Sequence, residues 1–176
     1  MKKLLLHVCC APCSTHVIET LKKEYDLTLF FYNPQIEPLK EYEKRLKEAE
    51  FYAIEMDIPL IVGDYDILDW HDCIKGHEND PEEGERCSLC FRYRLEKTAQ
   101  LAKENGFELF TTTLTVSPYK NAELINNIGK ELSEKHSIGF LESDFKKDDG
   151  YSHSIELSKR HNLYRQNYCG CIFSKK

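Results

Sequence analysis

Apolar runs and amphipathic segments alternate along the whole chain. Runs typical of buried strands lie at residues 3–9, 27–32, 59–62, 107–114 and 138–141. Segments with helical periodicity lie at residues 14–24, from 39 onward, and at 66–72, 87–105, 121–135 and 151–161. Strands that alternate with helices form a mainly parallel sheet, because each helix carries the chain back across one face of the sheet. We therefore expect an α/β fold with helices on both faces.

The chain has 176 residues, enough for one substantial core but short for two. We expect a single domain over residues 1–176, with a cysteine-bearing tail at about 162–176. No apolar run approaches the ~20 residues of a membrane span. The first apolar run stops at Cys9 and Cys10, too soon for a signal peptide. A cytoplasmic protein without a membrane partner is expected.

Seven of the eight cysteines fall into three groups: Cys9, Cys10 and Cys13; Cys87 and Cys90; Cys169 and Cys171. The first group directly follows the first strand, at the edge where parallel sheets bind ligands. Cytosolic thiols are kept reduced, so these groups indicate metal or redox chemistry rather than a disulfide framework. Cys73 stands alone, and we expect it to be structural.

Three kinds of cysteine chemistry remain open. A structural zinc site uses four thiolates and leaves three clustered cysteines without a role. A thioredoxin-like dithiol enzyme would use Cys10-Ala11-Pro12-Cys13, with Ser117-Pro118 as its cis-proline, and leaves five clustered cysteines without a role. An iron-sulfur cluster with a separate redox pair uses the excess more naturally. The pair would be Cys169-Gly170-Cys171, since glycine permits a small, easily reduced disulfide loop.

Charge is distributed unevenly. The net charge of -6 is unlike that of a general nucleic-acid binder. Residues 159–176 nevertheless hold five basic side chains and no acidic one, whereas residues 78–85 hold five carboxylates. A local basic patch can still bind a phosphate backbone.

Five stretches of sequence occur together in one order. They are residues 7–13 (HVCCAPC), 32–34 (YNP) with Glu41-Tyr42 and Arg45, 86–92 (RCSLCFR), 111–114 (TTTL) with 117–120 (SPYK), and 168–171 (YCGC). Together they resemble the epoxyqueuosine reductase QueH family, over nearly the whole chain.

This resemblance implies an oxidoreductase that reduces epoxyqueuosine to queuosine at the wobble position of tRNA, the last step of queuosine biosynthesis, with a 4Fe-4S cluster and an unidentified electron donor. It also implies a fold of the adenine-nucleotide α-hydrolase (PP-loop) type. Cysteines stand where PP-loop enzymes carry a Ser-Gly-Gly loop for pyrophosphate, so no ATP hydrolysis is expected.

The resemblance assigns roles to individual residues. The cluster ligands would be Cys9, Cys10, Cys87 and Cys90, and the redox pair Cys169 and Cys171. Cys13 would replace a ligand or help to hold a second iron or other metal ion. Either that metal or a proton donor would polarise the epoxide oxygen, and the candidate donors are Tyr119, His7 and Asp64. The side chains expected to contact tRNA are Arg92, Arg94, Tyr119, Lys120, Arg160 and Arg165.

Overall fold

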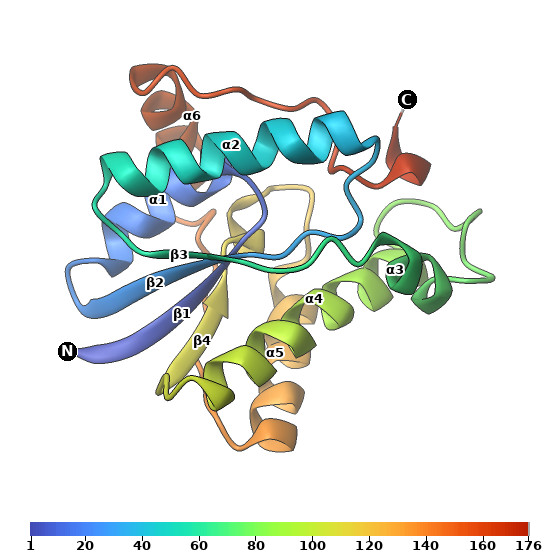
Figure 1. Cartoon of the computed structure of the whole chain (residues 1–176), viewed down its shortest axis with the longest axis horizontal. Helices are drawn as coiled ribbons and strands as arrows, with labels where there is room; N and C mark the ends of the chain where they lie inside the picture. Colours follow the sequence, from blue (N-terminus) through green and yellow to red (C-terminus); the bar gives the residue numbers. More distant parts are fainter. Residues whose placement is uncertain (176) are drawn as a thin grey trace.

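A five-stranded parallel sheet forms the centre of the computed structural model, which describes residues 1–175 (Figure 1). Its strands, in the spatial order β3-β2-β1-β4-β5, are β3 (Leu60–Val62), β2 (Tyr25–Phe31), β1 (Lys2–Val8), β4 (Leu109–Thr112) and β5 (Gly139–Phe140). All four pairings are parallel. The expected parallel sheet is confirmed.

Helices cover both faces of this sheet. One face packs against α1 (Ala11–Leu21) and α2 (Leu39–Glu55), with α6 (Gly150–Arg160) beside α1. The other face packs against α4 (Glu85–Glu104) and α5 (Ala122–His136). The short helix α3 (Ile67–Cys73) follows β3, and two 3-10 turns, η1 (Leu114–Val116) and η2 (Ile172–Ser174), complete the described chain.

The central strand β1 is buried on both faces. Leu4, Leu6 and Val8 belong to the core beneath α1 and α2, whereas Leu5 belongs to the core beneath α4 and α5. Successive side chains of a strand point to opposite faces, so a strand covered on both sides consists of consecutive apolar residues. That is why β1 is recognisable in the sequence and why its end is rigidly placed.

Helix α1 begins at Ala11, three residues before the expected start at Ser14. Cys10 is the residue before the first turn, with an extended backbone (φ -163°), and Pro12 lies within that turn. Proline is tolerated there because its missing N–H would have had no helical partner. The Ser14 hydroxyl donates back to the Ala11 carbonyl (2.7 Å) instead of capping the helix. Cys13 therefore lies on the helix rather than in the loop.

Other element ends differ by a few residues. Helix α4 begins at Glu85, two residues before Cys87. Strand β4 ends at Thr112 rather than Leu114, since the Thr112 hydroxyl accepts from the Leu114 amide (3.2 Å) and turns the chain into η1. The cis X-Pro bond in the described chain is Glu37–Pro38, so Ser117-Pro118 does not supply the cis-proline of the thioredoxin-like alternative.

After α6 the chain runs along α2 and ends beside α3 (Figure 1). Within residues 1–175, no helix has the length and apolar character needed to cross a bilayer.

Candidate metal and redox site

A cleft of about 960 Å³ lies at the carboxyl edge of the sheet. Cysteines from three distant segments line it: Cys9 and Cys13 at the start of α1, Cys87 and Cys90 on α4, and Cys169 and Cys171 in the tail. Parallel strands end at one edge, so the loops after them converge there. The fold thus brings members of all three cysteine groups to one space. Cys10 is buried beside Cys9 and is not itself part of the lining.

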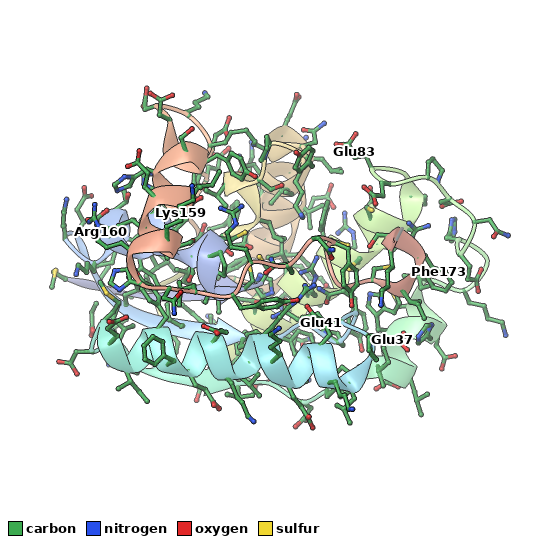
Figure 2. The ribbon with its side chains drawn as sticks, turned by 90° about the horizontal axis from the view of Figure 1, so that it is seen from above. Glu37, Glu41, Glu83, Lys159, Arg160 and Phe173 are labelled. Atoms are coloured by element: carbon green, nitrogen blue, oxygen red, sulfur yellow. The ribbon has the colours of Figure 1, made fainter. Side chains whose placement is uncertain are left out.

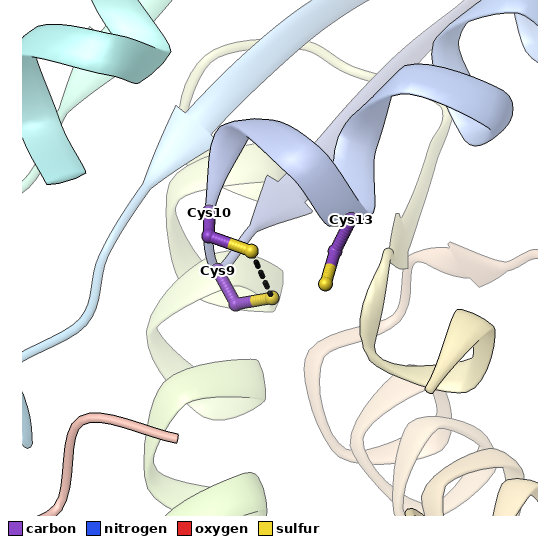
Figure 3. A group of neighbouring side chains, drawn as sticks. All are labelled: Cys9, Cys10 and Cys13. Atoms are coloured by element: carbon purple, nitrogen blue, oxygen red, sulfur yellow. Dashed lines mark hydrogen bonds between the residues drawn. The ribbon is translucent and has the colours of Figure 1, made fainter. Parts of the chain in front are cut away.

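The corner between β1 and α1 places three sulfur atoms together. The ligand atoms of Cys9, Cys10 and Cys13 all lie within 4.8 Å of one another, and the Sγ atoms of Cys9 and Cys10 are 3.9 Å apart (Figure 3). Thr113, directly after β4, holds the corner, since its hydroxyl accepts from the Cys9 amide (3.4 Å) and lies 3.6 Å from the Cys9 sulfur. This group could hold a metal ion.

One of these three thiols is favoured as a thiolate. Hydrogen bonds from Cys10 and Cys13 lower the pKa of Cys9 well below its usual range, and Lys120 contributes. Hydrogen bonding to Cys10 and Cys9 raises the pKa of Cys13. The pKa of Cys10 is raised to about 12, because its interaction with Cys9 and its burial outweigh the lowering hydrogen bond from Cys13. A metal bound at this corner would therefore displace protons from Cys10 and Cys13.

The first turns of α4 supply the second cysteine pair. Cys87 and Cys90 are three residues apart, which places them on neighbouring positions of one helix face. Burial raises the pKa of the Cys87 thiol. The buried guanidinium of Arg86 donates to the carbonyls of His77, Glu78 and Asp80 and so fixes the acidic loop before the helix.

The tail supplies the third pair. Cys169 is exposed, with its sulfur 2.9 Å from the Ser174 hydroxyl. Cys171 is buried with Trp70, Ile74 and Cys90, and burial followed by the nearby Cys169 raises its pKa to about 11. All eight cysteines are free thiols.

Arg45 on α2 fixes the tail, a role that the sequence did not reveal. Its side chain is 2% exposed, and its guanidinium donates to the carbonyls of Tyr168 and Cys169, each at 3.0 Å, and to Glu41 at 2.9 Å. The signal in the sequence was an arginine four residues after a glutamate on a helix, a spacing that pairs side chains. That pattern alone does not say that the pair is buried under the tail.

Gly170 allows the tail to approach this closely. Its φ of +115° suits glycine, and an added Cβ would lie 2.7 Å from Ile36 and 3.0 Å from the Arg45 guanidinium. The Gly170 carbonyl accepts from the Glu37 amide (2.9 Å). Both cysteines of the tail pair are therefore held by a backbone that is itself anchored.

Unpartnered polar atoms gather around the cleft. Six buried side-chain nitrogen or oxygen atoms have no hydrogen-bond partner within the described chain, and five of them belong to residues that line the cleft. These five residues are Gln35, Trp70, Arg86, Arg94 and Gln166. Buried polar groups are nearly always hydrogen-bonded, so this group of unpartnered polar atoms indicates a site that binds a polar ligand. Gln35, Trp70 and Gln166 carried no recognisable signal in the sequence.

Some of the residues expected to contact RNA line the cleft, and others lie outside it. Arg94, Tyr119, Lys120 and Arg165 line the cleft, and Tyr119 is 71% exposed. Arg92 is outside the lining and pairs with Glu131 (2.5 Å). Arg160 also lies outside it. Figure 2 shows Arg160 on α6, at the end of the molecule opposite Phe173 and Glu83.

Two candidate proton donors lie outside the cleft. His7 is fully buried, and its ring nitrogens contact the Thr112 hydroxyl (3.0 Å) and the Tyr32 carbonyl (2.9 Å). Burial and the nearby Arg94 lower its pKa to about 4. Asp64 is exposed and is not part of the lining. Neither side chain has the free, cleft-facing atom that proton transfer to a substrate requires.

The donor set fits an iron-sulfur group. Soft thiolates are the ligands of such clusters, and the cleft offers six cysteines and no histidine. Cys73, at the end of α3, is not in the lining.

Comparisons with known proteins agree on one family. A protein-family model described as epoxyqueuosine reductase QueH matches residues 4–176. The chain is 46% identical to an epoxyqueuosine reductase QueH from Histophilus somni over 98% of this chain and 72% of that protein. It is 41% identical to one from Thermotoga maritima, over 99% and 91% of the two chains.

A solved structure shares the fold. It is that of a predicted subunit of tRNA methyltransferase from Methanocaldococcus jannaschii, with a TM-score of 0.54 and 18% sequence identity, covering 89% of this chain and 74% of that one. At this identity the likeness concerns the fold alone.

Proposed function

Because the chain belongs to the epoxyqueuosine reductase QueH family of oxidoreductases, we propose that it reduces epoxyqueuosine at the wobble position of tRNA to queuosine, the last step of queuosine biosynthesis. The observation that carries the proposal is that six cysteines from three segments line one cleft. The enzyme would act in the cytoplasm, where tRNA is found, as a single domain over residues 1–176 with its tail at 162–176.

Cys9, Cys10, Cys87 and Cys90 are proposed to hold a 4Fe-4S cluster. Such a cluster supplies electrons one at a time. The first turns of α1 and α4 would stabilise its negative charge through their free N–H groups and helix dipoles. Cys13 shares the corner with Cys9 and Cys10, and its proposed role is to help hold a second iron or another metal ion.

Cys169 and Cys171 are proposed to form the redox pair. Oxidation of two thiols to a disulfide releases two electrons and two protons. The same number converts an epoxide to an alkene, since both C–O bonds break, the oxygen leaves as water and a C=C bond forms. Cys169 is exposed, so an external electron donor can reach the disulfide and return it to the dithiol.

The substrate is proposed to enter from the exposed side of the cleft. Lys120 and Arg165 line it and can meet phosphates of the anticodon loop. Tyr119 is exposed among the lining residues, where its ring can stack on a splayed base and its hydroxyl is the remaining candidate to protonate the epoxide oxygen. The unpartnered atoms of Gln35 and Gln166 suit the polar edge of a base.

Anaerobic purification followed by iron and sulfide analysis tests the proposal, together with turnover of tRNA that carries epoxyqueuosine. We expect brown protein with broad absorption near ~400 nm from thiolate-ligated iron, and conversion of the tRNA. Colourless protein with one zinc would instead support the structural zinc alternative. Metal-free protein with a reversible dithiol would support the thioredoxin-like alternative.

A further inference from the structure

Three arginines are buried in this protein, and they differ in how their charge is compensated. Arg45 is paired with Glu41, and Arg86 donates to three carbonyls. Arg94 is 4% exposed, and its one hydrogen bond is a long contact from Nη1 to the Asn33 side-chain oxygen (3.3 Å). Within residues 1–175 no carboxylate lies within 4.0 Å of Arg94, and its Nε has no partner.

The uncompensated charge of Arg94 destabilises the folded protein when nothing is bound in the cleft. A guanidinium carries a fixed positive charge in proteins. A buried charge without a partner of opposite sign is strongly unfavourable. The acidic residues that line the same cleft, Glu82 and Glu83, are both exposed and form no ion pair with Arg94. A negatively charged group bound in the cleft would supply the missing partner, because Arg94 lines that cleft.

The position of Arg94 indicates which negatively charged group is its partner. On α4 it follows Cys90 by four residues, which places both side chains on one helix face. Its partner Asn33 donates to the Val8 carbonyl (2.9 Å), directly before Cys9. Arg94 is thus one helical turn from Cys90 and is joined through Asn33 to the residue that precedes Cys9.

We infer that Arg94 is the buried counter-charge of the metal-thiolate group proposed at Cys9, Cys10, Cys87 and Cys90, and that its fixed positive charge raises the reduction potential of that group. Four thiolates give such a cluster a net negative charge, and reduction adds one more. Net charge and hydrogen bonds to sulfur are what set the potential of a protein-bound cluster. The inference rests on the proposed function, because it requires the cluster. Substrate phosphate is a weaker partner for Arg94, since Lys120 and Arg165 are the more accessible cations of the cleft.

The test compares Arg94→Met, Arg94→Lys and Arg92→Met with the unaltered protein. Arg92 is the matched control, since it lies on the same helix with 43% of its side chain exposed and pairs with Glu131. Each protein is purified anaerobically, its iron and sulfide content is measured, and the midpoint potential of the cluster is determined by reductive titration without tRNA. Arg94→Met should shift the midpoint to more negative values, Arg94→Lys should restore most of the shift, and Arg92→Met should leave it unchanged.

Several results separate the possibilities. An unaltered protein that contains no cluster would overturn the proposed function, and the inference with it, before any variant is compared. A cluster-containing Arg94→Met protein with an unchanged midpoint would overturn the inference alone, and a raised KM for tRNA in that variant would assign Arg94 to substrate binding. If Arg94→Met fails to assemble the cluster but Arg94→Lys succeeds, the charge is required, as inferred. If both fail, the shape of Arg94 matters rather than its charge, and the inference is wrong.

Discussion

The guanidinium of Arg45 donates to the main-chain carbonyl of Cys169 at 3.0 Å, across 124 residues of sequence. Its second nitrogen donates to the carbonyl of Tyr168, and its Nε to Glu41. A single buried side chain of α2 therefore holds the main chain of the tail at two successive residues, Tyr168 and Cys169.

Replacing Arg45 with methionine should release the tail. Hydrogen bonds to a charged group contribute about 1.5–3 kcal/mol each, and two of them reach the tail, so their loss should raise the open population of the tail roughly a hundred- to ten-thousandfold. Cys171, which is 5% exposed, should then react correspondingly faster with an alkylating reagent. Mass spectrometry of timed samples measures this rate.

Lys44→Met is the matched control for this variant. Lys44 neighbours Arg45 on α2 and contacts the tail through the Tyr164 ring, 3.6 Å from its centroid, but it is exposed. Its replacement should leave the rate at Cys171 nearly unchanged. If Arg45→Met also left Cys171 protected, other tail contacts, such as that between Gly170 and Glu37, would be sufficient.

Replacing either Cys87 or Cys90 with serine should abolish iron and sulfide binding. A hydroxyl is a poor substitute for a soft thiolate, so the cluster would lack a ligand. Cys73→Ser should retain full iron content, since Cys73 is outside the lining of the cleft. A normal cluster in Cys90→Ser would show that another cysteine of the cleft, such as Cys13, is a ligand in its place.

The double variant Cys169→Ser/Cys171→Ser should retain iron and sulfide but lose turnover with a physiological electron donor. Cluster and redox pair come from different segments, so the tail sulfurs can be removed without touching the proposed ligands. Metal analysis and a single-turnover assay on the same preparation separate the two functions. Loss of iron in this variant would make the tail cysteines ligands instead.

Arg165→Ala should weaken tRNA binding, whereas Arg160→Ala should not. Each phosphate contact contributes about -0.7 to -0.9 to the slope of log K against log salt. Arg165 lines the cleft and Arg160 does not, so only the first variant should flatten the slope and raise the KM for tRNA. Binding titrations over a range of salt concentrations measure both. Equal effects of the two variants would mean that the RNA extends over α6.

The fold could be predicted because it depends on local patterns. Strand β1 is a run of apolar residues because it is buried on both sides, and α4 carries its apolar residues at helical spacing. The first cysteine group could be placed at the carboxyl edge of the sheet, because it directly follows a strand. These features are encoded within a few residues of one another.

The path of the tail could not be predicted in the same way. Arg160 and Arg165 are close in sequence, yet the chain turns at Asn162, which has a positive φ of 54°, and only Arg165 reaches the cleft. The partners that hold the tail, Arg45 and Glu37, lie more than a hundred residues earlier. Pairings over such separations leave no periodic trace in a sequence.

The position of β1 at the centre of the sheet also determines when the cysteine corner can exist. Its partner strand β4 is about a hundred residues later in the sequence, since His7 and Thr112 are 105 residues apart. Thr113, which follows β4, holds Cys9 in place. Contacts between such distant segments form slowly, because a long loop must close first. In a newly made chain, the corner that carries Cys9, Cys10 and Cys13 is therefore completed only after the second half of the chain has folded.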